Sequence, residues 1–155
     1  MAELTPRPDI VPPLAPGRSC DGCTTCCKLL GIAQLKKQPQ VWCEHCAVGK
    51  GCNIYDSRPD DCRTFYCGWV LDQSLGEKWD PRHSKLVVKF EANRIVIHVD
   101  KDRRDAWRKE PFHTQIRRWA AQAMAMRGDV VVWEGLDGIR VLPDGEQKIG
   151  RAAAY

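Results

Sequence analysis

Hydrophobic and polar residues alternate clearly only in the second half of the chain. The stretches 85–90 and 95–99 follow the period of two that is typical of strands, and residues 91–94 between them suit a turn. Apolar side chains at every second position share one face: Leu86, Val88, Phe90, Ile95, Ile97 and Val99. The pattern therefore predicts a β-hairpin.

A helix is predicted over residues 111–127. Pro111 suits the first turn of a helix, and Gly128 suits the position at which a helix ends. Apolar residues at helical spacing form the predicted buried face: Phe112, Ile116, Trp119, Ala120 and Ala123. Two further strands, 130–133 and 139–142, flank a glycine-containing turn. Hairpin, helix and hairpin together predict a four-stranded antiparallel sheet with one packed helix.

The first half of the chain has no such period and is organised by cysteine instead. We divide the chain into a proline-rich arm or strap (1–17), a cysteine-cluster module (18–70), an irregular connection (71–84), the hairpin, helix and hairpin unit (85–145) and a tail (146–155). The predicted fold class is α+β, with an N-terminal cysteine-rich metal-binding module followed by a small antiparallel sheet and its helix.

Length and charge narrow the classes of function. The chain has 155 residues, and its 24 basic residues are nearly offset by 20 acidic ones, so the net charge of +4 gives little support for nucleic acid or anionic membrane as the partner. No apolar run approaches the roughly 20 residues that span a bilayer, and the N-terminus lacks the pattern of a secretory signal. We therefore expect a cytoplasmic protein without a membrane partner.

All nine cysteines lie within residues 20–67: Cys20, Cys23, Cys26, Cys27, Cys43, Cys46, Cys52, Cys62 and Cys67. In a reducing compartment, an odd number of cysteines with C-x2-C spacings favours metal ligation over disulfides. The run C-x2-C-x2-C supplies three ligands in ferredoxin-like [4Fe-4S] proteins, and zinc commonly takes four thiolates from C-x2-C arms. The cofactor is thus predicted to be an iron-sulfur cluster or zinc, in one or two centres.

Adjacent cysteines at 26 and 27 limit how one site can be built. Neighbouring side chains leave the backbone in different directions, so Cys26 and Cys27 either face two centres or one of them is buried and inert. Eight cysteines suffice for two four-cysteine sites. One cysteine is then spare, or His45 replaces a thiol in a mixed site.

The combination of C-x2-C-x2-C-C at 20–27, Cys43-x-His45, and GCNIYDSRPDDCRTFYC at 51–67 resembles the CxxCxxCC cysteine-cluster family. These YkgJ-like proteins are described as zinc- or iron-chelating, and sometimes as Fe-S oxidoreductases. The resemblance covers about 50 residues, up to Trp69. It implies ligand roles for Cys20, Cys23, Cys26, Cys27, Cys43, Cys52, Cys62 and Cys67. Cys46 stands where the family pattern usually has an apolar residue, although its spacing from Cys43 suits a ligand.

Two arginines in the second cysteine block have two interpretations. Arg58 and Arg63 can donate to thiolate sulfur and tune a metal site, or they can pair with the neighbouring aspartates on the surface. His83, His98 and His113 lie far in sequence from any cysteine pair, so we do not assign them as ligands.

The sequence predicts a metal-binding cysteine-cluster protein that acts in electron transfer or redox sensing if it binds an Fe-S cluster, with an unknown protein or redox partner. The alternative is a zinc-ribbon-like interaction module that binds nucleic acid or a protein. For nucleic acid, the candidate residues are Arg103, Arg104, Arg108, Lys109, Arg117 and Arg118, with Trp107 and Trp119 for stacking. Interspersed acidic residues make a solvated surface the better explanation. No catalytic motif is present, so an enzymatic activity is not assigned.

Overall fold

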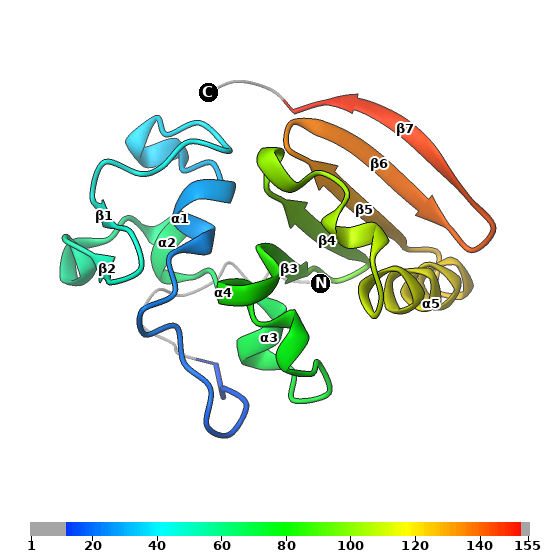
Figure 1. The fold of residues 1–155 in the computed structure, drawn as a ribbon, viewed down its shortest axis with the longest axis horizontal. Helices are drawn as coiled ribbons and strands as arrows, with labels where there is room; N and C mark the ends of the chain where they lie inside the picture. The colour runs from blue at the N-terminus through cyan, green and yellow to red at the C-terminus, as the bar shows by residue number, and fades with distance from the viewer. Residues whose placement is uncertain (1–11, 153–155) are drawn as a thin grey trace, which may run out of the picture.

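Two sheets organise the chain, of which residues 12–152 are described in this computed structural model (Figure 1). The small sheet pairs β1 (Cys46–Ala47) with β2 (Gly51–Cys52) in antiparallel fashion. The large sheet has five strands: β3 (Leu86–Phe90), β4 (Arg94–Val99), β5 (Asp129–Glu134), β6 (Asp137–Leu142) and β7 (Gly145–Arg151). The fold class is α+β, as predicted.

The large sheet differs from the predicted one in two respects. Its strands follow the order β3-β4-β5-β6-β7, and β4 pairs with β5 in parallel, so that Ile97 lies opposite Val132. The prediction of a wholly antiparallel sheet was therefore wrong for this pair, because helix α5 (Phe112–Ala125) returns the chain to the start of the sheet before β5 begins. The fifth strand, β7, occupies most of the predicted tail.

Helix α5 packs on β5 and β6 through the face that the sequence predicts. Ile116, Trp119 and Ala120 are buried there. The residue with left-handed backbone at the end of the helix is Arg127, with φ of 58°, whereas Gly128 serves a different purpose. A Cβ atom at position 128 would lie 2.1 Å from the carbonyl oxygen of Asn93, so only glycine allows this close approach of the two backbones.

The other helices are single turns, too short to be stable alone. The α-helical ones are α1 (Thr25–Leu29), α2 (Asp60–Arg63), α3 (Gly68–Leu71) and α4 (Pro81–Ser84). The 3-10 turns are Ala33–Leu35, Tyr55–Ser57, Glu77–Trp79, Lys101–Arg103 and Ala106–Arg108. Tertiary contacts must hold them, and α4 shows one local device: the Asp80 carboxylate accepts a hydrogen bond from the backbone amide of Arg82 at 3.0 Å.

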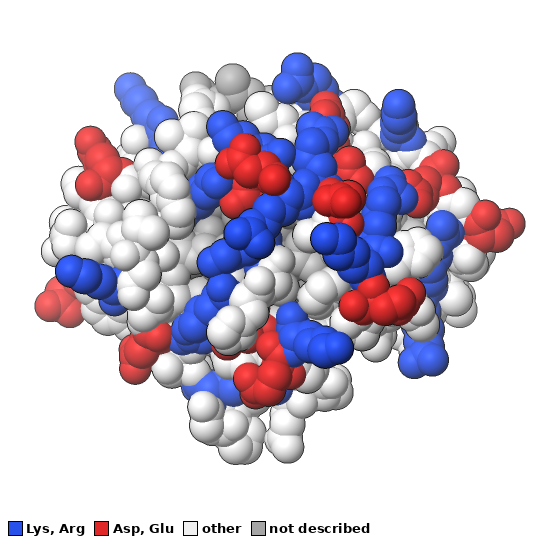
Figure 2. All heavy atoms as spheres, in the orientation of Figure 1, with Lys and Arg blue, Asp and Glu red and all other residues white. Residues whose placement is uncertain are grey.

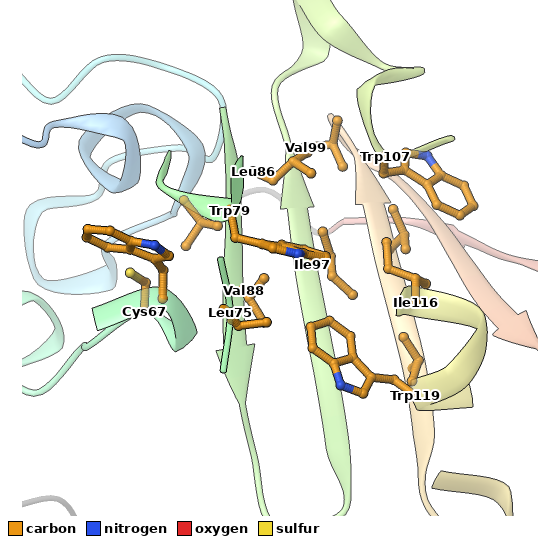
Figure 3. Close-up of a cluster of buried hydrophobic side chains, with 14 of the residues drawn as sticks. Cys67, Leu75, Trp79, Leu86, Val88, Ile97, Val99, Trp107, Ile116 and Trp119 are labelled. Atoms are coloured by element: carbon orange, nitrogen blue, oxygen red, sulfur yellow. The ribbon is translucent and has the colours of Figure 1, made fainter. Parts of the chain in front are cut away.

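One hydrophobic core extends from the cysteine-bearing segment through the sheet to α5 (Figure 3). Cys67 lies at one end of this core and Trp107 near the other. Trp79, from the segment predicted to be irregular, is 4% exposed and makes an edge-to-face contact with Phe112 at 4.8 Å between ring centroids. The two halves of the chain therefore share a core.

The last residues of the predicted arm lie against the body of the protein. The backbone amide of Ala15 donates to the carbonyl of Val70 at 2.7 Å, and Ala15 is buried. The Arg18 guanidinium donates to the carbonyl oxygens of Trp69 and Asp72 at 2.6 and 2.9 Å, which satisfies acceptors at and just beyond the end of α3. Residues 1–11 of the arm lie outside the described residues.

The longest helix of the described chain is α5, with 14 residues. No helix within residues 12–152 combines the length and the apolar character needed to cross a membrane.

Candidate metal centre

The nine cysteines lie on loops, single helical turns and the short strands β1 and β2 at one side of the large sheet, in the part of the chain that Figure 1 draws in blue to green. Cys26 and Cys27 belong to α1, Cys62 belongs to α2, and Cys67 immediately precedes α3. All nine are free thiols.

Backbone hydrogen bonds hold the two cysteine blocks in place. The amide of Cys23 donates to the carbonyl of Cys20 at 2.9 Å, and Gly22 between them has φ of 74°, a left-handed conformation that suits glycine. The amide of Cys43 donates to the carbonyl of Cys27 at 3.1 Å and so joins the second block to the first. Residues far apart in the sequence thereby meet in one region.

The first thiol group consists of Cys20, Cys23, Cys26 and Cys67. Cys20 is exposed, but neighbouring protein atoms restrict the hydration of its thiol, and this effect together with negative charge on Cys67 and Cys23 raises its pKa to about 11. Burial also raises the pKa of Cys67, with a contribution from Cys23, and the pKa of Cys26 responds to both Cys23 and Cys20. Electrostatic coupling of this kind requires the thiols to be near one another. The first block and the distant Cys67 therefore come together.

The second thiol group consists of Cys27, Cys43, Cys46, Cys52 and Cys62. Burial and negative charge on Cys27, Cys43 and Cys52 together raise the pKa of Cys62 to about 11. Cys46 and Cys52 are opposite one another in the β1–β2 pair. Every cysteine that the resemblance implies as a ligand thus has thiol neighbours in one of the two groups.

The adjacent cysteines on α1 connect the groups. A hydrogen bond from the Cys26 thiol to Cys27 lowers the pKa of Cys27 and raises that of Cys26. Apart from this contact, the neighbours of the two residues differ. Cys26 is coupled to Cys20 and Cys23, whereas Cys27 accepts a second hydrogen bond from Cys46, which lowers its pKa further.

Proximity within the two groups is looser than in a closed ligand set. Among residues 12–152, no three His, Cys, Asp or Glu side chains already converge as a metal-binding group. The thiols are close enough to shift each other's pKa, which is a weaker condition than sharing one tetrahedral centre.

Basic side chains accompany the thiols, and one of them, Lys37, is not predicted from the sequence. Lys37 is 8% exposed, and its ammonium group donates to the carbonyl of Lys28 at 2.9 Å and to that of Leu30. Burial lowers the pKa of Lys37 to about 8, while negative charge on Cys43 and Cys27 acts in the opposite direction. No spacing rule in the sequence singles out this lysine, because its neighbours come from both cysteine blocks.

The two predicted arginines occupy different environments. Arg58 is half-buried, lies over the ring of Tyr55 at 3.9 Å, and lowers the pKa of Cys20, Cys27 and Cys62 through its charge. Arg63 is exposed. Neither arginine forms an ion pair with a carboxylate in the described part of the chain. Arg58 is therefore the one that faces the thiols.

His45 has an acidic neighbour. Its Nε2 atom lies 3.4 Å from a carboxylate oxygen of Glu44, and its carbonyl accepts a hydrogen bond from the amide of Asn53 at 2.8 Å. None of the shifted cysteine pKa values responds to His45. His45 is thus not among the main influences on the pKa of these six thiols.

The donor set fits a thiophilic metal or cluster. Two groups with four and five sulfur atoms match centres that take four thiolates, and soft sulfur ligands select zinc, copper(I) and Fe-S clusters over hard cations. Nearby positive charge from Lys37, Arg58 and Arg82 would offset part of the negative charge of such a centre.

The residues considered for nucleic acid are mostly engaged elsewhere. Trp107 is fully buried and donates from its indole nitrogen to Glu134 at 2.7 Å, and Trp119 is 9% exposed. Arg104 pairs with Asp137 at 2.7 Å, as Arg108 does with Glu146. Figure 2 shows basic and acidic side chains interleaved over this face. Stacking on these tryptophans is therefore blocked in this conformation.

Comparison with known proteins identifies no relative of this chain. The chain matches no family model, no curated protein and no solved structure, so its resemblance to the CxxCxxCC cysteine-cluster family remains a prediction from the motif.

Proposed function

We propose that this protein binds metal through its cysteine thiolates, as two centres built from the two thiol groups. The observation that supports the proposal is the gathering of nine free thiols from 48 residues of chain into two adjoining groups, beside an ordinary hydrophobic core that needs few of them. A lone buried cysteine is common as a small apolar residue, but nine in one region are not explained by packing.

The first centre would use Cys20, Cys23, Cys26 and Cys67. Three of these follow the C-x2-C-x2-C spacing, and the fourth ligand of such a run must come from elsewhere in the chain. Cys67 is buried at the end of the hydrophobic core, where packing restrains it. A ligand held in this way would attach the cysteine-bearing loops to the rest of the fold.

The second centre would use Cys27, Cys43, Cys52 and Cys62, with Cys46 as a hydrogen-bond donor to the sulfur of Cys27. A protein donor to a ligating sulfur lowers the negative charge on that sulfur and tunes the affinity or potential of the metal. Arg58 and Lys37 would act on the same group through their positive charge.

Both metals named from the sequence suit this donor set. An Fe-S cluster supplies one-electron redox chemistry, and the protein would then serve electron transfer or redox sensing. Zinc supplies no redox chemistry, and the protein would then be a structural or metal-chelating module.

The deciding experiment is analysis of metal and acid-labile sulfide on the full chain purified without oxygen. Iron with stoichiometric sulfide and a broad visible absorption band would identify clusters, whereas colourless protein with two zinc ions would identify structural sites. Protein that is folded, binds neither metal and does not take up either on reconstitution would refute the proposal.

Metal affinity is expected to fall steeply as the pH falls. In the metal-free protein the pKa of Cys20 is about 11, and those of Cys26 and Cys67 are raised, so protons occupy these sulfurs at neutral pH and must leave when metal binds. Release of at least these three protons from the four ligating thiols would weaken the first centre by a factor of at least roughly a thousand for each pH unit of acidification. Chelator competition at pH 7 and pH 8 would measure the slope, and an affinity independent of pH would contradict thiol ligation.

A further inference from the structure

A second candidate binding site lies where the cysteine-bearing loops meet the large sheet. A cavity of about 470 Å³ opens there, within the range of small-molecule sites. One wall comes from the loop around Cys23, through Gly22, Thr24 and Thr25, and from Trp42. The other comes from residues next to the sheet, including Arg82, Lys85 and Arg103.

Positive charge in the cavity exceeds negative charge. Four of the lining residues are basic and two, Asp100 and Asp102, are acidic. Asp100 and Asp102 both bind Lys28, at 2.9 and 3.1 Å. The carboxylate of Asp80, which does not line the cavity, forms an ion pair with Arg82 at 3.2 Å. With Asp80 counted, four basic and three acidic residues leave the site with one net positive charge.

Lys85 and Arg103 are the basic residues left over. Neither has a carboxylate within ion-pair distance in residues 12–152, although the charge of Arg103 acts on nearby Asp100. Lys85 is half-buried and lines the cavity. Two such cations on one cavity favour a ligand with a doubly charged anionic group, and a phosphate monoester carries about −1.5 to −2 charges at neutral pH.

The cavity also has an apolar wall that the hydrophobic core does not use. Trp42 is 41% exposed and Val48 is 59% exposed, although both are large apolar side chains. The ammonium group of Lys28 lies over the Trp42 ring, 5.9 Å from its centre, so a cation and an exposed indole lie side by side at the cavity. An exposed indole beside cations is suited to stacking against a flat ring.

We propose that this cavity binds a small phosphate ester that carries an aromatic ring, of which a nucleoside monophosphate is the simplest representative. Lys85 and Arg103 would bind the phosphate, and Trp42 would stack on the ring. Its walls belong to both halves of the chain, so the bound ligand would bridge the cysteine-bearing loops and the sheet. Binding of this ligand would not depend on which metal the cysteines hold.

Calorimetric titration of the full chain with AMP, inorganic phosphate and adenosine tests the proposal. AMP is expected to bind more tightly than either of its parts, and its affinity should fall as salt is added. Trp42→Ala should weaken AMP roughly tenfold through loss of stacking and leave inorganic phosphate unaffected. Arg103→Met should weaken AMP and phosphate alike, and since Arg103 is exposed this variant should fold normally.

Lys109→Met is the matched control, because Lys109 is an exposed lysine outside the cavity. It should leave AMP binding unchanged. Absence of AMP binding at millimolar concentration would overturn the proposal. Equal affinity for AMP and inorganic phosphate would overturn the role of Trp42 in binding the ring. An equal loss of AMP affinity in Lys109→Met and Arg103→Met would show that AMP responds only to the general surface charge, and this would overturn the role of Arg103.

Discussion

Replacing Cys67 with serine is expected to remove the metal of the first centre and leave that of the second. Cys67 is buried against the hydrophobic core, Cys23 raises its pKa and Cys67 raises that of Cys20, whereas none of the main contributions to the pKa of Cys67 comes from the second thiol group. A serine hydroxyl is a poor ligand for a thiophilic metal. Bound metal should therefore fall to about half, since each four-thiolate centre is filled separately.

The reciprocal variant is Cys62→Ser, which should empty the second centre alone. A structural zinc site contributes on the order of 10 kcal/mol to folding, so each variant should also destabilise the cysteine-bearing segment strongly. Elemental analysis gives the metal content per chain, and hydrogen exchange over residues 18–70 reports which loops lose protection.

Cys46→Ser is the control for both variants. Serine retains a hydroxyl that can donate to Cys27, so this change should lower the metal content little and the stability of the segment by about 1 kcal/mol. Equal and complete metal loss in all three variants would contradict two separate centres. Selective loss in Cys46→Ser, with metal retained in Cys62→Ser, would exchange the roles of these two cysteines.

The elements that the sequence predicts correctly are those with a strong hydrophobic period. The hairpin of β3 and β4 and the buried face of α5 follow directly from alternation and helical spacing. Strand β7 could not be predicted in this way, because almost all of its residues are exposed and its pairing with β6 defines it. The parallel pairing of β4 with β5 likewise depends on how two hairpins dock, which periodicity does not specify.

Prediction of the candidate site was limited in a similar way. The cysteine spacing indicates metal binding and identifies all nine thiols, but it cannot say that Cys67 joins the first block. That association depends on the packing of α3 against β3. Lys37 could not be predicted either, because only the fold brings it close to cysteines from both blocks.

Leu29 connects the two parts of the molecule, and Leu29→Ala is expected to lower the free energy of unfolding by about 3 kcal/mol. Its side chain is fully buried in the common core, and α1 lies against β3. Loss of the side chain leaves a cavity that the closely packed surroundings fill only in part. Urea unfolding would measure the change. Leu30→Ala is the matched control, because Leu30 is half-buried and the same truncation should cost about 1 kcal/mol there.

The same substitution tests whether the core positions the thiols. Leu29 follows Cys26 and Cys27 on α1, the helix through which the two proposed centres adjoin. If packing of Leu29 against the sheet holds this helix, then Leu29→Ala should release metal to a chelator faster than Leu30→Ala does, at equal metal content before the challenge. Equal release rates, together with the expected loss of stability, would show that the cysteine-bearing loops hold their metal without help from the core.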